Sequence, residues 1–211
     1  MPGIYVQYGC GLSAPAEWYN FDASPTLRLQ KLPIVGGIFK KKVDFPKNVR
    51  YGNILKSLPG IEEETCKGIY CSHVLEHLSL NDFNVALKNT YRLLKPGGIF
   101  RCVVPDLEYS INQYIKDLKI KPESAAGEFL GATMLGIKNR PKSFKDFIIS
   151  FTGNSHHLWM WDQYALQSEL EKTGFTKVRK CIYNDSSDNM FQFVEDESRF
   201  INAVAFEAVK P

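Results

Sequence analysis

Residues 67–105 read KGIYCSHVLEHLSLNDFNVALKNTYRLLKPGGIFRCVVP, which we interpret as a strand, a helix and a second strand. The apolar residues of the middle part recur at three- and four-residue steps and so form one stripe along a helix. Ser79 and Asp82 provide a capping-box-like start, and KPGG at 95–98 ends the helix, because proline cannot continue it. Two buried strands joined by a helix require a crossover, so we expect them to lie parallel in one sheet. The stripe consists of Leu80, Phe83, Leu87, Tyr91 and Leu94.

Strand and helix patterns extend from this unit toward both ends of the chain. The last two predicted strands have no helical pattern between them, so we expect them to pair antiparallel. The predicted fold is a three-layer α/β/α Rossmann-like sandwich with a mostly parallel seven-stranded sheet and an antiparallel last strand. Strands are predicted at 3–8, 18–22, 48–54, 67–74, 99–105, 176–183 and 200–209, and further helices at 24–32, 107–118 and 161–175.

Length and composition place limits on the class of protein. The 211 residues, 44% hydrophobic and 23% charged, fit a single domain over 1–211, with 106–162 as an acceptor-binding or lid insertion. The net charge of +3 and the lysine run at 40–42, which we interpret as a solvated loop, predict no nucleic-acid partner. No apolar stretch reaches the roughly 20 residues of a membrane span. The N-terminus lacks the pattern of a signal peptide, so a cytoplasmic location is expected.

The five cysteines do not follow the spacing of a metal site. Three of them lie in apolar strand-like runs, where a free cysteine behaves as a small hydrophobic residue. His156 and His157 are adjacent, so their side chains would diverge on a regular element, and no acidic cluster accompanies them. The sequence therefore predicts no metal ion.

Several residues that follow the predicted strands are candidates for a binding site. Ligands of open α/β sheets bind beyond the carboxyl ends of the strands. Glycines allow a close backbone approach to a ligand, and Asp22 can accept both hydroxyl protons of a ribose. Asn53 can accept a proton from an adenine amino group while the next backbone N–H donates to the ring. A plain tight turn remains the alternative for the glycines. The expected cofactor contacts are Gly9, Cys10, Gly11, Asp22, Asn53, Ile54, Ser72 and His73.

The link after Gly11 narrows the choice of cofactor. Only LSAPAE, residues 12–17, separates this glycine from the next predicted strand. A dinucleotide carries a pyrophosphate, which favours a helix N-terminus directly after the glycines. The link is too short for a long helix, which disfavours a nicotinamide-dependent oxidoreductase. A cofactor with adenine and ribose but no phosphate, such as S-adenosylmethionine (SAM), does not need that helix.

Residues 68–108 resemble the central region of class I SAM-dependent methyltransferases of the type 11-like group. Such enzymes have a strand, SHVLEH, a helix, LKPGG, a strand and VPDL in this order. Residues 7–22 resemble the shortened first motif of a subgroup often encoded among genes for surface polysaccharides and other glycoconjugates. Residues 51–59 resemble its adenine-contacting segment, with Asn53 in place of the usual aspartate, and 198–211 resemble its last strand. The resemblance implies SAM as cofactor and S-adenosylhomocysteine (SAH) as product.

Methyl transfer to a hydroxyl requires a base that removes the proton as the new bond forms. His73 ends the fourth predicted strand, while His156 and His157 lie in the loop GNSHHLWMW at 153–161. Asp106 is a further candidate base or a ligand for acceptor hydroxyls, although it could equally cap the following helix. For His77 a structural hydrogen bond to backbone is expected, and Tyr109 is a more distant candidate.

The leading hypothesis is a SAM-dependent methyltransferase acting on a hydroxyl of a sugar or glycan-related small molecule. A carboxylate or nitrogen acceptor remains open, as does a non-catalytic protein that binds SAM as a regulatory partner. Activity that survived loss of every histidine would point to a carboxylate acceptor, which needs no base. The sequence leaves the oligomeric state open.

Overall fold

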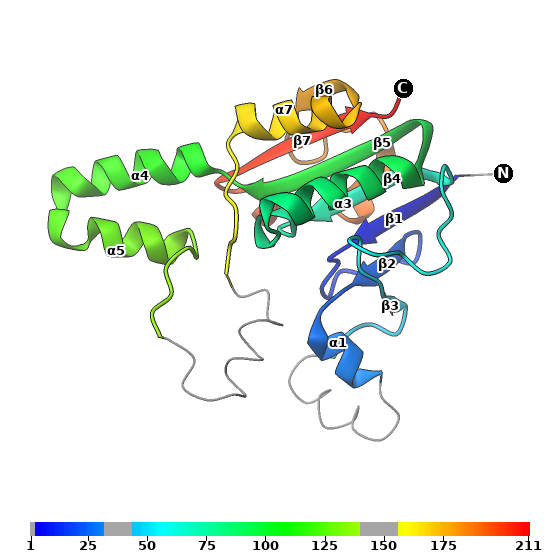
Figure 1. Cartoon of the computed structure of the whole chain (residues 1–211), viewed down its shortest axis with the longest axis horizontal. Helices are drawn as coiled ribbons and strands as arrows, with labels where there is room; N and C mark the ends of the chain where they lie inside the picture. The colour runs from blue at the N-terminus through cyan, green and yellow to red at the C-terminus, as the bar shows by residue number, and fades with distance from the viewer. Residues whose placement is uncertain (1–2, 32–43, 140–155) are drawn as a thin grey trace.

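The computed structural model describes residues 3–31, 44–139 and 156–211 (Figure 1). The predicted lysine loop at 40–42 and part of the predicted insertion, 140–155, lie outside the described residues. A seven-stranded sheet with the order β3-β2-β1-β4-β5-β7-β6 forms the centre. Its strands are β1 Ile4–Tyr8, β2 Tyr19–Asp22, β3 Val49–Tyr51, β4 Cys66–Ser72, β5 Leu94–Pro105, β6 Thr176–Lys180 and β7 Ala203–Val209.

The pairing of the strands confirms the predicted mixed sheet. β1 pairs parallel with β2 and with β4, β2 with β3, and β4 with β5. β7 runs antiparallel to both β5 and β6, as predicted for the last strands. Because β1 lies between β2 and β4, the order of the strands switches direction at β1. The carboxyl ends of these three strands therefore meet at one edge, where ligands of such sheets bind.

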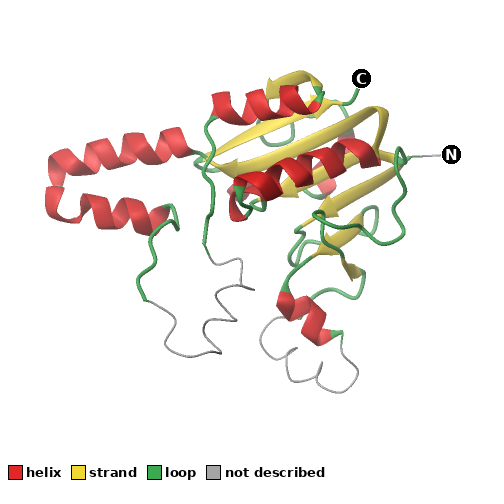
Figure 2. Cartoon of the chain, in the orientation of Figure 1, coloured by secondary structure: helices red, strands yellow, loops and turns green. Residues whose placement is uncertain are grey.

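Two helices, α3 Leu80–Leu93 and α7 Gln163–Thr173, cover one face of the sheet (Figure 2). Phe83 and Leu87 of α3 are fully buried against the strands, and full burial of such a side chain contributes about 1.5–3 kcal/mol. The Ser79 hydroxyl accepts a hydrogen bond from Asp82 N at 3.2 Å, which confirms the predicted cap. None of the described helices is long and apolar enough to cross a bilayer.

Short 3₁₀ turns and loops cover the opposite face. They include η2 Asn189–Phe193 and η3 Glu197–Phe200. Trp18 and Phe191 pack edge to face at a ring-centroid distance of 5.4 Å within the core of this side. The segments that form this layer lack helical periodicity, so the third layer contains few regular helices. All five cysteines are buried and free, although the sequence predicted an apolar role for only three of them.

The junction between α3 and β5 differs from the prediction. We predicted a strand from residue 99, but β5 begins at Leu94, immediately after the helix. Leu94 pairs with Cys66, and the register then shifts so that Ile99 pairs with Gly68. The KPGG residues form an irregular segment within this strand, with Gly97 at a φ of 75°. Proline and glycine therefore interrupt the hydrogen-bonded pairing of β4 and β5 and do not precede it.

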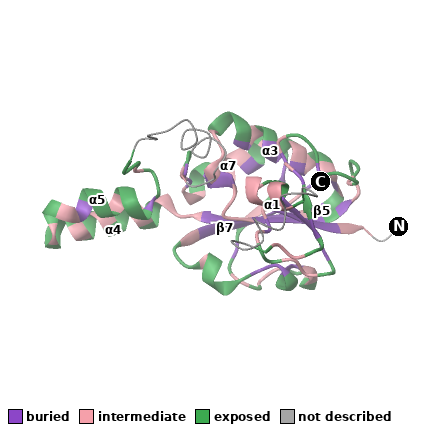
Figure 3. Cartoon of the chain, turned by 90° about the horizontal axis from the view of Figure 1, so that it is seen from below, coloured by how far each residue is buried: buried purple, intermediate pink, exposed green. Residues whose placement is uncertain are grey.

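A helical hairpin extends from the carboxyl end of β5 and projects from the sheet (Figure 1). It consists of α4 Leu107–Ile120 and α5 Pro122–Ala132. No residue of α4 is buried, whereas buried residues concentrate in the strands and on the inner helix faces (Figure 3). The single-domain boundaries and the acceptor-binding role of this region stay predictions.

Arg101 lies in the middle of β5 and is only 1% exposed. Its guanidinium donates hydrogen bonds to Glu195 at 2.6 Å, to Glu207 at 2.8 Å and to Asp185 at 3.0 Å. A buried cation needs such partners, because an unpaired charge in the interior is strongly destabilising. The three acids come from three different segments, so this cluster joins the C-terminal part of the chain to the central sheet.

Candidate active site

A pocket of about 600 Å³ opens at the carboxyl ends of β1, β2 and β4. This volume lies in the range of small-molecule and cofactor sites. Most of the expected cofactor contacts line it, although they come from four separate loops. The sequence-predicted residues in its wall are Gly9, Gly11, Asp22, Asn53, Ile54 and His73.

Both predicted glycines have left-handed backbone conformations, with φ of 66° at Gly9 and 54° at Gly11. A Cβ added to Gly9 would lie 2.2 Å from Cγ2 of Val74, so this loop packs directly on the segment that follows β4. A Cβ at Gly11 would meet no atom within 4 Å. The loop is therefore a tight turn that also presents its backbone to the pocket.

Asp22 joins the loops that follow β1 and β2. Its Oδ2 accepts a hydrogen bond from Gly11 N at 2.9 Å, and its Oδ1 accepts one from Ser24 N at 2.7 Å. The residue is 8% exposed and lines the pocket. A carboxylate has about four acceptor positions, so it can still receive two hydroxyl protons from a ligand. The position fits the predicted ribose contact.

Asn53 and Ile54 form the far wall of the pocket. Asn53 Oδ1 accepts a hydrogen bond from Leu55 N at 2.9 Å, so the amide oxygen stabilises its own turn. The Ile54 carbonyl accepts one from Asn89 Nδ2 at 2.7 Å, which ties this loop to α3. The expected adenine contact would thus use the remaining lone pair of the Asn53 oxygen.

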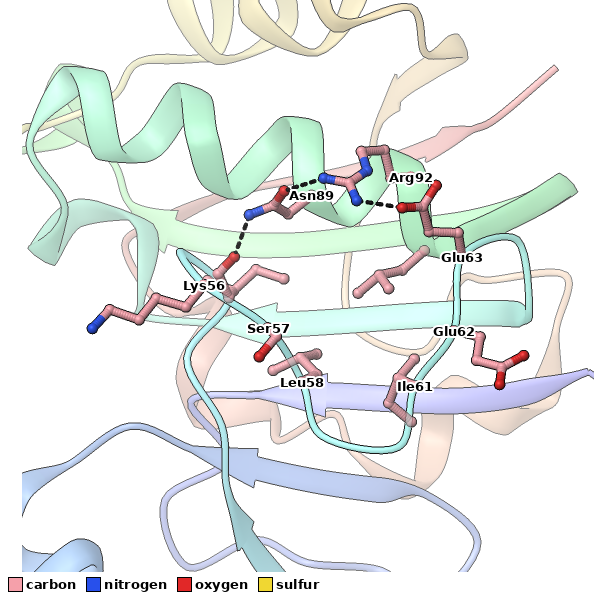
Figure 4. A pocket seen from close by; sticks show the side chains of 10 residues that line it. Lys56, Ser57, Leu58, Ile61, Glu62, Glu63, Asn89 and Arg92 are labelled. Carbon is pink, nitrogen blue, oxygen red and sulfur yellow. Dashed lines mark hydrogen bonds and ion pairs between the residues drawn. The ribbon is translucent and has the colours of Figure 1, made fainter.

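Asn89 also borders a smaller hollow of about 300 Å³ on the outer side of that loop (Figure 4). Asn89 Oδ1 accepts a hydrogen bond from Arg92, which in turn pairs with Glu63. Arg92 and Glu63 are each more than half exposed. Exposed pairs of this kind contribute little, and we assign this hollow a structural role in holding the loop.

Five of the predicted site residues do not line the large pocket. Cys10 packs with Leu27 and Val49 in a small core cluster, and burial raises the pKa of its thiol to about 12. Asp106 caps α4, because its Oδ1 accepts a hydrogen bond from Glu108 N at 2.8 Å. The remaining three are Ser72, His156 and His157.

His73 lines the pocket in a strained backbone conformation, with a φ of 54°. Its Nε2 lies 2.9 Å from the Arg199 carbonyl oxygen. A carbonyl oxygen can only accept, so Nε2 carries the proton and Nδ1 has a free lone pair. Nδ1 lies 3.5 Å from Oε1 of Glu76, and burial lowers the pKa of His73. Strained residues cluster at functional sites.

Glu76 lies beneath His73 and was not among the predicted site residues. It is 1% exposed, and neither carboxylate oxygen has a hydrogen-bond partner among the described residues. Burial raises the pKa of its carboxyl to about 8. His77 Nε2 lies 3.9 Å from Glu76 Oε1. An acid between two histidines in an otherwise apolar run, HVLEHL at 73–78, was the sequence signal for this buried carboxyl.

His77 and His157 complete the polar cluster around Glu76. His77 Nδ1 donates to the His156 carbonyl at 3.0 Å, which confirms the structural hydrogen bond expected for it, yet His77 also lines the pocket. His157 packs against it with ring centroids 4.9 Å apart. Burial lowers the pKa of His157 to about 4.

Sequence reasoning also missed the side of the pocket formed by α1, Pro25–Gln30, by the segment before β3 and by the last residue of β3. Arg28, Phe45 and Tyr51 line it there. The Arg28 guanidinium carbon lies 5.9 Å from the centroid of the Tyr51 ring. This wall offers aromatic surface and one cation, and its only sequence signal was the short helix that follows Asp22.

Comparisons with known proteins identify a family model and solved structures of similar fold. A family model described as "Methyltransferase domain" matches residues 9–180. No curated protein sequence matches the chain.

The solved structures with a similar fold include the following two. One is a SAM-dependent methyltransferase from Thermotoga maritima, described as a possible histamine N-methyltransferase. It aligns with a TM-score of 0.50 and 18% identity over 100% of this chain and 83% of the other. The other, a SAM-dependent methyltransferase from Archaeoglobus fulgidus, aligns with a TM-score of 0.51 and 15% identity over 99% of this chain and 86% of its own.

Proposed function

The chain belongs to the methyltransferase domain family, and on that premise we propose that it transfers the methyl group of SAM to a small-molecule acceptor. The observation that carries the proposal is the Asp22 carboxylate in the wall of the 600 Å³ pocket, beside the glycine loop. The alternative of a pyrophosphate-containing cofactor lacks support, because residues 12–17 form no helix after Gly11.

The pocket has the groups that such a cofactor needs. Asp22 would accept the ribose hydroxyl protons, and the Asn53–Ile54 turn would face the adenine. The backbone around Gly9 and Gly11 would hold the amino-acid end, since glycine leaves N–H and C=O groups accessible. Tyr51 and Phe45 offer ring surface at the side of the pocket.

The acceptor would approach from the histidine side of the pocket. When bound, SAM supplies a methyl group on a sulfonium sulfur, and transfer of this group breaks the S–C bond and leaves SAH. The protein would mainly orient the acceptor. His73 lines this side of the pocket and would take the proton of an acceptor hydroxyl on Nδ1, which lies 3.5 Å from Glu76 Oε1.

We extend the proposal to a hydroxyl of a sugar or glycan-related molecule as the acceptor. Methylation of a hydroxyl needs a base, whereas methylation of a carboxylate does not, and His73 would provide this base. The shortened first motif supports the link to glycoconjugates. The helical hairpin and the segment up to 162 would contribute the acceptor pocket, since α4 starts directly at the carboxyl end of β5.

The test is formation of SAH from SAM in the presence of matched acceptor sets: sugars and nucleotide sugars, primary amines, and carboxylic acids. The proposal expects turnover with the hydroxyl set. Turnover with amines or acids alone would contradict the acceptor class while leaving methyl transfer intact. SAM binding without turnover in any set would favour the non-catalytic alternative.

A further inference from the structure

The cluster beneath the histidine side of the pocket has the composition of a metal centre. Glu76, His77 and His157 each offer one ligand atom, and these atoms all lie within 4.8 Å of one another. Zn²⁺ binds imidazole nitrogen and carboxylate oxygen at about 2.0–2.2 Å, so tetrahedral ligands stand roughly 3.4 Å apart. The 3.9 Å between His77 Nε2 and Glu76 Oε1 needs only a small side-chain rotation to close.

The hydrogen bonds around the cluster orient its nitrogens toward a shared centre. His77 Nδ1 must carry a proton because it faces the His156 carbonyl oxygen at 3.0 Å, so the Nε2 lone pair points to the side of Glu76. Metal-ligating histidines almost always donate their other ring N–H in this way. His73 repeats the arrangement, with Nε2 on the Arg199 carbonyl and Nδ1 facing Glu76.

Several ligand atoms lack any partner of their own in the described part of the chain. Both carboxylate oxygens of Glu76 and the Nδ1 of His157 are buried without a hydrogen bond. No lysine or arginine of the described segments lies within ion-pair distance of Glu76. Burial leaves these lone pairs unsatisfied, and either a proton on Glu76, whose pKa burial raises to about 8, or a cation between the side chains would satisfy them.

We propose that Glu76, His77 and His157 bind a divalent transition-metal cation of the Zn²⁺ type. Two imidazoles and one carboxylate suit Zn²⁺ far better than Mg²⁺ or Ca²⁺, which prefer oxygen ligands. Three protein ligands leave a fourth position open, as in catalytic zinc sites. His77 also lines the pocket, so this ion would lie next to the pocket wall.

A catalytic use of this ion rests on the proposed function. A metal ion lowers the pKa of a bound hydroxyl, so an acceptor oxygen at the fourth position would give up its proton to His73 more readily. The metal-binding claim itself does not depend on methyl transfer. It is therefore tested without SAM and without an acceptor.

The experiment uses tag-free full-length protein that has been treated with a chelator and dialysed against micromolar Zn²⁺. Bound metal is measured by mass spectrometry, and Co²⁺ substitution reports the ligand geometry by visible absorption. The wild type should bind one Zn²⁺ per chain and show tetrahedral Co²⁺ absorption, and excess Mg²⁺ should not displace the Zn²⁺. No stoichiometric Zn²⁺ in the wild type, or displacement by Mg²⁺, would overturn the proposal.

The chain provides a matched control in two adjacent histidines. His157→Asn and Glu76→Gln should weaken Zn²⁺ binding at least tenfold, whereas His156→Asn should bind as the wild type does, because the His156 ring is not one of the three ligands and its backbone carbonyl, which holds His77, is kept. Equal binding by all four proteins would refute the assigned ligands. If the ligand variants do not fold, the melting temperature of the wild type with and without Zn²⁺ tests the proposal. An ion bound at a specific site must raise the melting temperature, so an unchanged value would refute the site.

Discussion

The Asp22 carboxylate accepts the Gly11 N–H at 2.9 Å, so the end of β2 holds the loop that follows β1. A second hydrogen bond, from Ser24 N at 2.7 Å, ties the start of α1 to the same carboxylate. One side chain thus holds two loops beside the pocket, in addition to its proposed contact with the ribose. Loss of this carboxylate should affect both ligand binding and the order of the two loops.

We expect Asp22→Ala to weaken SAH binding by about 1–3 kcal/mol, which is the cost of leaving buried polar groups unpaired. Isothermal titration calorimetry measures this change directly. Asp162→Ala is the matched control, because Asp162 also accepts a backbone N–H, from Ala165 at 2.8 Å, but does not line the pocket. Equal affinities of the two variants would remove Asp22 from the binding site.

Gly9→Ala should lower both the stability and the affinity for SAH. The left-handed conformation costs a non-glycine residue roughly 1–2 kcal/mol, and the added Cβ would collide with Val74. Gly127→Ala in α5 is the control, since a Cβ there meets no atom within 4 Å and alanine favours the helix. Thermal melts of both variants would show a decrease for Gly9→Ala and no decrease for Gly127→Ala. A Gly9→Ala protein as stable as the wild type would contradict the described loop.

His73→Asn separates catalysis from binding. Asparagine tolerates a positive φ better than most residues, so the φ of 54° at this position should persist. If His73 removes a hydroxyl proton, turnover should fall by a factor of about 10²–10⁴, while SAH affinity changes far less. Steady-state kinetics with the best acceptor provide the test. Unchanged turnover would return His73 to a structural role.

Arg101→Met should destabilise the protein by about 3–5 kcal/mol, because Glu195 would remain as a buried carboxylate without a cation and Glu207 would keep only its pair with Arg179. Chemical denaturation measures the loss. Arg92→Met removes an exposed pair with Glu63 and should leave the unfolding midpoint nearly unchanged. A similar result for both arginines would mean that the buried cluster contributes no more than a surface pair.

The sequence predicted the fold well where a local pattern carries the information. The apolar stripe of α3, its Ser79 cap and the helix α7 are all set by neighbouring residues. The start of β5 at Leu94 was missed, because the pairing with Cys66 is a long-range contact that outweighs the KPGG signal. The order and register of parallel strands depend on contacts across the whole sheet. The sequence therefore predicted a mostly parallel sheet but not its strand order or register.

The site, too, was predicted only where a local sequence pattern marks its residues. Gly9, Gly11 and Asp22 follow strands directly, and the fold brings every such position to one edge. Glu76 was overlooked because its burial depends on the segment around 156–159, whose backbone donates two hydrogen bonds to the Glu76 carbonyl. The contact between His157 and His77 likewise could not be predicted, because no sequence pattern relates these two distant residues.

Calorimetric titration of the purified protein with SAH tests the central claim most directly. We predict binding of one SAH per chain with a micromolar dissociation constant, which Asp22→Ala weakens and Asp162→Ala does not. Titration with NAD under the same conditions should give no heat of binding. No SAH binding at millimolar concentration, or a preference for NAD, would contradict the assignment of the pocket at Asp22 to SAM.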